Sequence, residues 1–318
     1  AKAADESDLG VDPQRHAGLY GAQRAKAMSA VLLGLLLSVL DYAIANVALP
    51  SIAHDLNAPS SRAIWVVNAY QLANLSCLLP LASFGSRVGF ARMSQIGIFL
   101  FLITSVGCAL SQNLLELTLA RALQGVGGAC IMSVNIALVR FIYPHAELGK
   151  GIALNGLFVG IGVALGPTIG SIVLSVATWP WIFWINLPLA LAALVMAHFA
   201  LPQTPRSETQ ADIPGSLLTV ASFALLGIGL DGLMHGDFLP GSLLTGAGVI
   251  CWWLLLRYQK GRREPIVPVD LQARRPFLLA CLVGFLGFVA SNLYIVAMPF
   301  RSEERRVGKS VDLGGRRI

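Results

Sequence analysis

Two opposite charges interrupt long apolar stretches of this 318-residue chain. Asp41 precedes Pro50 by nine residues, and Arg121 follows Asn113 by eight. At 1.5 Å per residue in a helix, each charge lies roughly 12 to 13 Å from the end of its stretch. An ionised side chain so deep in an apolar medium costs at least about 2.5 kcal/mol, so each should face a cavity or a partner. A carboxylate beside a guanidinium can bind and release a proton; the alternative is a pair that only fixes helix packing.

The stretches around these charges have the length and composition of membrane-spanning helices. Hydrophobic residues make up 55% of the chain and charged residues 13%, which leaves too few polar groups to cover a soluble protein. About 20 apolar residues in a helix cross a hydrocarbon core of about 30 Å. The sequence therefore predicts an all-α membrane protein with nine spans. They cover Met28–Leu49, Ala63–Phe84, Met93–Leu110, Leu114–Val139, Gly151–Ala177, Ile182–Leu201, Gly215–Leu233, Gly241–Leu256 and Pro276–Phe300.

Polar side chains form a stripe on the second predicted span. Asn68, Gln71 and Asn74 are spaced by three residues, which places them within about a third of the helix circumference. Such a stripe suits a water-filled cavity or hydrogen bonds between helices, and the spacing favours neither interpretation over the other. Asn68 and Gln71 therefore join the candidate site residues.

Small residues recur along the fifth predicted span. Gly162, Gly166 and Gly170 are four residues apart, so they form one stripe where another helix backbone can approach closely. Pro167 lacks an amide hydrogen and interrupts the hydrogen-bond ladder beside this stripe. Generic close packing in a membrane bundle is the alternative explanation for the glycines alone.

The net charge of +6 does not indicate a nucleic-acid partner, because the basic residues follow the loops and form no nucleic-acid-binding motif. With the N-terminus in the cytoplasm, fifteen Lys and Arg residues before residue 301 lie inside and only Arg62 lies outside. Positive residues favour the cytoplasmic side, so the N-terminus is expected there. No two histidines share a predicted span, and the five cysteines lack metal-ligand spacing. The sequence predicts neither a metal site nor a cofactor.

Four sequence motifs occur in order along the first five spans. They read Leu40-Asp41-Tyr42-Ala43-Ile44-Ala45-Asn46-Val47-Ala48-Leu49-Pro50, Trp65-Val66-Val67-Asn68-Ala69-Tyr70-Gln71-Leu72, Leu117-x3-Arg121-x2-Gln124-Gly125-x-Gly127-Gly128-Ala129 and Gly162-x3-Gly166-Pro167-x2-Gly170-Ser171. Together they resemble the fourteen-helix drug:proton antiporters of the major facilitator superfamily, over about residues 27–300. The arginine of the fourth-span motif is implicated in proton coupling in that superfamily. The resemblance therefore implies that Asp41, Arg121 and Gln124 take part in proton coupling or substrate binding.

The resemblance also implies a domain organisation. A cytoplasmic segment (residues 1–27) precedes a six-helix bundle (28–201), a polar linker (202–214) and the extra two-helix hairpin of the family (215–257). A basic cytoplasmic loop (258–275) and the first helix of a C-terminal bundle (276–300) follow. Residues 301–318 carry nine charges after a span with none, and Arg301–Lys309 resembles a translated sequencing adapter. We expect residues 301–318 to be a non-native tail and the chain to be truncated and inactive in transport.

The loop between the second and third spans departs from the family pattern. It reads Ala82-Ser83-Phe84-Gly85-Ser86-Arg87-Val88-Gly89, with Ser86 where the family has an aspartate. That aspartate is thought to join a charge network that controls the conformational switch. The resemblance therefore assigns gating to Arg87, Gly89 and Arg92, without the usual acidic partner.

The resemblance implies a proton-coupled secondary transporter that exports drugs or other small lipophilic molecules by alternating access, with the proton gradient as energy source. Such a protein is multi-pass in the plasma or inner membrane, and its partners are the lipid bilayer, protons and a small-molecule substrate. The alternatives are another porter of the superfamily, for a metabolite or sugar, and a polytopic membrane receptor or sensor. The motif around Gly166 and the extra hairpin disfavour the first, and a sensor leaves Asp41 and Arg121 unexplained. We do not expect this protein to be an enzyme, because the sequence shows no set of residues with catalytic spacing.

The charge asymmetry predicts that the loops Arg87–Arg92, Arg140–Lys150 and Arg257–Arg275 face the cytoplasm. In a background without native cysteines, single cysteines at Asn57 and Asp237 should react with an impermeant thiol reagent added from outside. A cysteine at Gly89 should react only after the membrane is permeabilised. Labelling of Gly89 in intact cells would overturn this orientation.

Overall fold

The computed structural model describes residues 18–207, 212–260, 262, 266, 275–287 and 289. Every regular element within those residues is a helix, which confirms the all-α class. The chain divides into two compact units, residues 1–258 and 259–318. Eight helices in the described residues are long and apolar enough to cross a membrane, and they match the first eight predicted spans.

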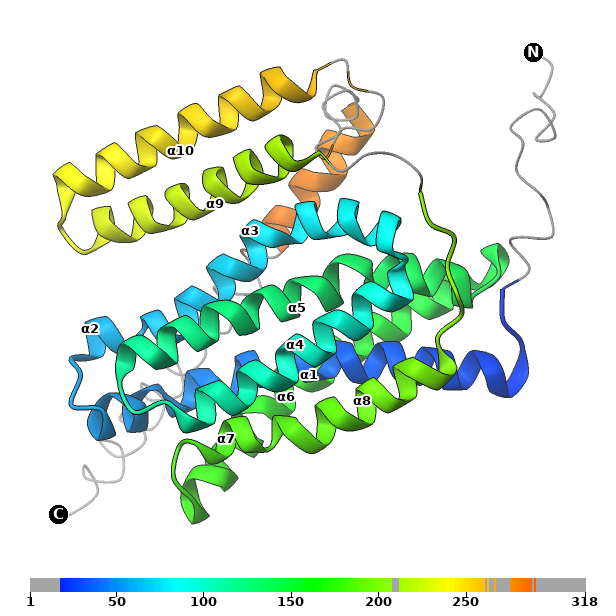
Figure 1. Cartoon of the computed structure of the whole chain (residues 1–318), viewed down its shortest axis with the longest axis horizontal. Coiled ribbons are helices and arrows are strands. Elements are labelled where there is room, and N and C mark those ends of the chain that lie inside the picture. Colours follow the sequence, from blue (N-terminus) through cyan, green and yellow to red (C-terminus); the bar gives the residue numbers. More distant parts are fainter. Residues whose placement is uncertain are drawn as a thin grey trace, which may run out of the picture. The chain divides into compact units, whose positions relative to one another are not determined.

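Six spans form the first bundle, and two more follow as a hairpin (Figure 1). The bundle helices are α1 (Gly21–Asp55), α3 (Trp65–Val88), α4 (Phe90–Leu110), α5 (Leu114–Ile142), α6 (Leu148–Val176) and α8 (Asn186–Ala200). Three short elements lead into α3, α6 and α8, namely α2 (Ser60–Ala63), η3 (His145–Glu147) and α7 (Trp181–Trp184). The hairpin consists of α9 (Ile213–Met234) and α10 (Phe238–Gln259).

The ninth predicted span, Pro276–Phe300, belongs to the second unit. An apolar helix covers Arg275–Gly287. Residues 288 and 290–300 lie outside the described residues, as does the predicted tail 301–318. The segment predicted for residues 1–27 lies outside them up to residue 17.

The helix α1 is longer at both ends than the predicted span Met28–Leu49. It begins at Gly21, because the polar turn before the buried residues Ala27 and Met28 continues the same helix. It also continues through Pro50 to Asp55. Membrane helices tolerate an internal proline where neighbouring groups satisfy the freed backbone carbonyl, so Pro50 was a poor marker of the helix end.

The core of the bundle lies around α1. The most apolar window of α1 is 72% buried, compared with 17% for α9 and for α10. The helix α1 packs against α5, α6 and α8, whereas α3 and α4 both pack on α5, and α9 packs on α3 (Figure 1). Large apolar side chains such as Phe101, Leu138 and Phe183 fill the interior. Asp41 of α1 and Arg121 of α5 are therefore surrounded by protein.

The glycine stripe of α6 faces α1. Gly162, Gly166 and Gly170 are all buried. A Cβ at Gly162 would lie 2.8 Å from Val39 Cγ1, and one at Gly166 would overlap the Cβ of Ala43. Since Asp41 lies between Val39 and Ala43 along α1, the stripe sets how closely α6 approaches the helix that carries this carboxylate.

Gly166→Ala should destabilise the bundle by about 1 to 3 kcal/mol, because the added methyl group overlaps Ala43 across a close helix contact. Gly160→Ala is the matched control, since a Cβ at this exposed glycine of α6 would meet nothing within 4 Å. Unfolding of both variants by SDS in mixed micelles, followed by circular dichroism, measures the difference. Equal stability of the two variants would contradict the close α1–α6 contact.

Candidate functional site

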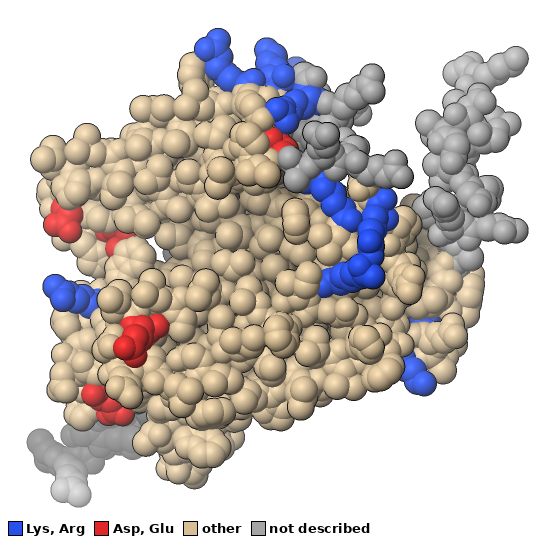
Figure 2. All heavy atoms as spheres, in the orientation of Figure 1, with Lys and Arg blue, Asp and Glu red and all other residues tan. Residues whose placement is uncertain are grey.

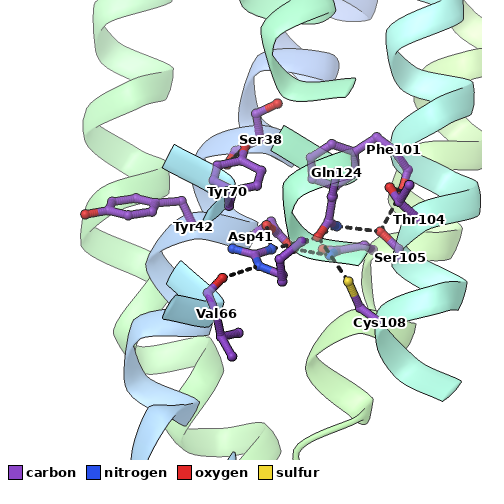
Figure 3. A network of polar contacts seen from close by, with 12 residues as sticks. Ser38, Asp41, Tyr42, Val66, Tyr70, Phe101, Thr104, Ser105, Cys108 and Gln124 are labelled. Atoms are coloured by element: carbon purple, nitrogen blue, oxygen red, sulfur yellow. Dashed lines mark hydrogen bonds and ion pairs between the residues drawn. The ribbon is translucent and has the colours of Figure 1, made fainter. Parts of the chain in front are cut away.

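The two charges predicted to lie deep in the membrane meet inside the bundle. Figure 3 shows the surroundings of Asp41. Nη1 of Arg121, on α5, lies 2.5 Å from Oδ2 of Asp41, on α1. The two side chains are 0% and 2% exposed. The equal depth inferred from their positions along the two spans therefore corresponds to a direct ion pair.

Other groups hold Arg121 as well. Its Nε donates to the Val66 carbonyl at 3.1 Å, and its Nη1 also donates to Gln124 Oε1 at 2.7 Å. The guanidinium carbon lies 4.5 Å from the centre of the Tyr70 ring and 5.6 Å from that of Phe183, within range of cation–π attraction. Several favourable contacts of Arg121 are thus independent of the carboxylate.

The second oxygen of Asp41 extends the network to two further helices. Oδ1 accepts from Asn186 Nδ2 at 2.6 Å and from Gln124 Nε2 at 3.2 Å. Gln124 Nε2 also donates to Ser105 Oγ at 2.8 Å, and Cys108 Sγ donates to Gln124 Oε1 at 3.5 Å (Figure 3). The network therefore joins α1, α4, α5 and the first residue of α8. All three partners of the carboxylate are donors, so this arrangement satisfies its ionised form.

Glycines of α5 allow this geometry. A Cβ at Gly125 would overlap the Tyr70 carbonyl, and one at Gly128 would lie 2.7 Å from the Tyr70 hydroxyl. The backbones of α3 and α5 can therefore approach closely. Arg121 lies one turn before Gly125, and Val66 lies one turn before Tyr70, so the same approach brings the guanidinium to the Val66 carbonyl.

The structure places the predicted polar residues in two different surroundings. Gln124 belongs to the network, whereas Asn68 and Gln71 form no hydrogen bond to it among the described residues. Asn68 Nδ2 donates to Asp231 Oδ1 of α9 at 3.4 Å, and Gln71 is exposed. At Asn68, the polar stripe of α3 is a contact between the bundle and the hairpin.

The predicted gating residues lie at the turn between α3 and α4. Arg87 is in the last turn of α3, Arg92 is in the first turn of α4, and Gly89 joins the two helices with φ of +99°. This left-handed backbone conformation favours glycine over any residue with a side chain. The described residues contain no group of three or more His, Cys, Asp or Glu side chains that could hold a metal ion.

Several members of the network were not identified from the sequence. Tyr70 lies in Trp65–Leu72, a segment that resembles a family motif, and this resemblance was the available signal. Ser105 and Cys108 are small residues in an apolar span without informative spacing. Only the rotation of α4 about its axis, which the sequence does not specify, brings them to Gln124.

Eight apolar helices in the described part of the chain, with an ion pair buried between α1 and α5, define a multi-pass helical membrane protein with an ionisable centre. The family model described as "Major Facilitator Superfamily" matches residues 31–314, and the chain belongs to this superfamily. This result confirms the superfamily that the sequence motifs resemble.

Three relatives illustrate the range of names in the superfamily. The uncharacterised transporter YebQ of Escherichia coli strain K12 is 41% identical over 288 residues, which are 89% of this chain and 63% of YebQ. The riboflavin transporter RibZ of Clostridioides difficile strain 630 is 31% identical over 277 residues, or 86% of this chain and 60% of RibZ. A protein of Escherichia coli O81 strain ED1a, provisionally named multidrug resistance protein MdtD, is 32% identical over 273 residues, or 85% of this chain and 57% of that protein. The chain thus spans between 57% and 63% of the length of these relatives.

Solved structures agree on the fold. The human organic anion transporter MFSD10 (TETRAN) has a TM-score of 0.53 and 17% identity, and the match covers 65% of this chain and 55% of that one. At this identity the likeness shows the fold alone.

Removing one partner of the buried ion pair should be more damaging than removing both. Asp41→Leu leaves the guanidinium without a counter-charge and should destabilise the bundle by about 3 to 5 kcal/mol. Adding Arg121→Leu should recover part of that loss, because no buried charge is then left unpaired. A double-mutant cycle, measured by SDS unfolding, gives the coupling energy. Strictly additive effects of the two changes would contradict a direct pair.

Proposed function

We propose that this protein is a proton-coupled exporter of small molecules that works by alternating access in a bacterial cytoplasmic membrane. The observation that supports this proposal most strongly is the buried Asp41–Arg121 pair, whose charges come from different helices. A proton bound to Asp41 removes the attraction between them. A receptor or sensor has no need of such a proton-dependent contact in its interior.

Protonation changes which hydrogen bonds Asp41 can make. The carboxylate accepts from Arg121, Asn186 and Gln124. The neutral acid has no charge and one of its oxygens becomes a donor, so its bond to Arg121 weakens and the attraction between α1 and α5 falls. Arg121 keeps its bond to the Val66 carbonyl of α3. In our proposal, protonation therefore releases α1 while the arginine stays with α3 and α5.

The proton gradient supplies enough energy for export. One proton that moves down a potential of 100 mV releases about 2.3 kcal/mol. Each tenfold step in substrate concentration requires about 1.4 kcal/mol. One proton per substrate therefore supports more than a tenfold concentration ratio at that potential.

We place the N-terminus of the chain in the cytoplasm. In Figure 2 most of the Lys and Arg side chains lie at the top and right, and most of the acidic side chains lie at the left. Arg24, at the start of α1, pairs with Glu147 in the loop before α6, so the N-terminal end of α1 lies beside the Arg140–Lys150 loop. Basic loops favour the cytoplasmic side, which supports this orientation.

A carrier for a polar metabolite is the second candidate function. RibZ, named a riboflavin transporter, is 31% identical to this chain, and the protein named MdtD is 32% identical. Because the two identities are nearly equal, these names give no preference between a drug and a metabolite as the substrate. Export of lipophilic dyes without export of riboflavin would support the drug exporter, and the reverse result would support the metabolite carrier.

Asp41→Asn should abolish export driven by a pH gradient in proteoliposomes of the full-length protein, because an amide cannot take up and release the coupled proton. Asp55→Asn changes an exposed carboxylate on the same helix and should transport like the unaltered protein. Full gradient-driven export by Asp41→Asn would sink the proton-coupling proposal.

A further inference from the structure

A small pocket lies where the α3–α4 turn meets the segment that follows α8. Its volume is about 270 Å³, slightly below the usual range of about 300 to 1,000 Å³ for small-molecule sites. Its polar lining comes from Arg92 and Gln95 of α4, His198 of α8, and Gln203, Thr204 and Arg206 of the following segment. The size suits a compact polar group better than a drug-sized molecule.

The side chains that line the pocket favour the binding of an anion. Arg92 and Arg206 carry two guanidinium groups, and none of the lining residues in the described part of the chain is acidic. Guanidinium groups bind phosphate oxygens through short charge-assisted hydrogen bonds. Figure 2 shows basic side chains gathered at this end of the molecule.

The turn and the segment after α8 are fixed against each other, so the pocket is a built feature. The Ser207 amide donates to the Ser86 carbonyl at 2.9 Å. A Cβ at Gly89 would lie 3.3 Å from Thr204 Oγ1, and φ at Gly89 is +99°, so glycine permits this close approach. Gln95 Nε2 donates to the Ala197 carbonyl at 3.1 Å and holds the wall between α4 and α8.

One residue that lines the pocket has an unsatisfied hydroxyl group. Thr204 Oγ1 is buried and has no hydrogen-bond partner among the residues that the structure describes. Buried polar atoms without partners are uncommon, because each costs free energy comparable to a lost hydrogen bond. A bound anion would neutralise Arg92 and Arg206, and it would accept from this hydroxyl once the Thr204 side chain turns toward the pocket.

The sequence of the turn removes the competing negative charge. Ser86 stands where the resembled family has an aspartate, and its hydroxyl donates to the Ser83 carbonyl at 2.8 Å. The turn therefore offers the nearby guanidinium groups no carboxylate at this position. A bound anion can neutralise these guanidinium groups in place of a carboxylate.

We propose that this pocket binds a phosphate-type anion, supplied either by an anionic lipid headgroup or by free phosphate, which joins the α3–α4 turn to the end of α8. The bound group accepts from Arg92, Arg206 and Thr204. Binding of an anion here does not depend on the transported substrate or on proton coupling.

The test compares the unaltered purified chain with variants of the pocket and of a control surface. Arg92→Gln with Arg206→Gln removes the charges of the pocket, and Arg62→Gln with Arg140→Gln removes the same charge from exposed positions outside it. Each form is titrated with inorganic phosphate in detergent at constant ionic strength, and the melting temperature is followed by tryptophan fluorescence. Each form is also released from nanodiscs of phosphatidylglycerol and phosphatidylcholine, and the retained lipid is identified by native mass spectrometry.

A saturable rise of the melting temperature with phosphate would identify a free anion, and selective retention of phosphatidylglycerol would identify a lipid headgroup. The affinity for phosphate or the amount of retained phosphatidylglycerol should fall at least about tenfold in the pocket variant, because charge-assisted hydrogen bonds are lost. Both should be unchanged in the control variant. Thr204→Val keeps all charges and should also weaken binding, which preserves the test if the double variant misfolds. Binding of neither probe by the unaltered chain, or equal binding by pocket and control variants, would overturn the proposal.

Discussion

The contact between Asp41 and Arg121 constrains the rest of the bundle, because two charges that are 2% and 0% exposed are tolerated in a dry interior only when they are paired and hydrogen-bonded. The helices α1 and α5 must therefore hold these side chains together. Glycines meet this requirement on both sides of the pair. Gly166 of α6 lies against the back of α1, and Gly125 of α5 lies against the backbone of α3, so backbones rather than bulky side chains set the distances.

The same construction is compatible with movement. Smooth glycine surfaces interlock less than ridges of large side chains, so helices that meet through them can slide with little repacking. The helices α4 and α8 contribute Ser105 and Asn186 to the charged network and Arg92 and His198 to the basic pocket. In our proposals, a proton at the network and an anion at the pocket thus act on the same two helices.

The sequence predicted the parts of this structure that follow from composition and from the cost of a buried charge. Eight spans, the matching depth of Asp41 and Arg121, and the glycine stripe belong to this group. Contacts that depend on how each helix is rotated about its axis could not be predicted from the sequence. Asn186 was not recognised as a partner of Asp41, and the hydrogen bond from Asn68 to Asp231 of α9 was not predicted. The ends of α1 were misplaced because Pro50 does not stop a helix that neighbouring helices support.

In our proposal, Asp41 gains and loses a proton inside the bundle, and its contact with Arg121 weakens when the proton is bound. Infrared difference spectroscopy of the full-length protein between high and low pH observes both groups directly. A protonated-carboxyl band should appear on acidification, should be absent in Asp41→Asn, and should be accompanied by a change in the guanidinium bands of Arg121. An Asp41 that stays ionised, with unchanged guanidinium bands, over the whole pH range in which the protein transports would contradict this proposal.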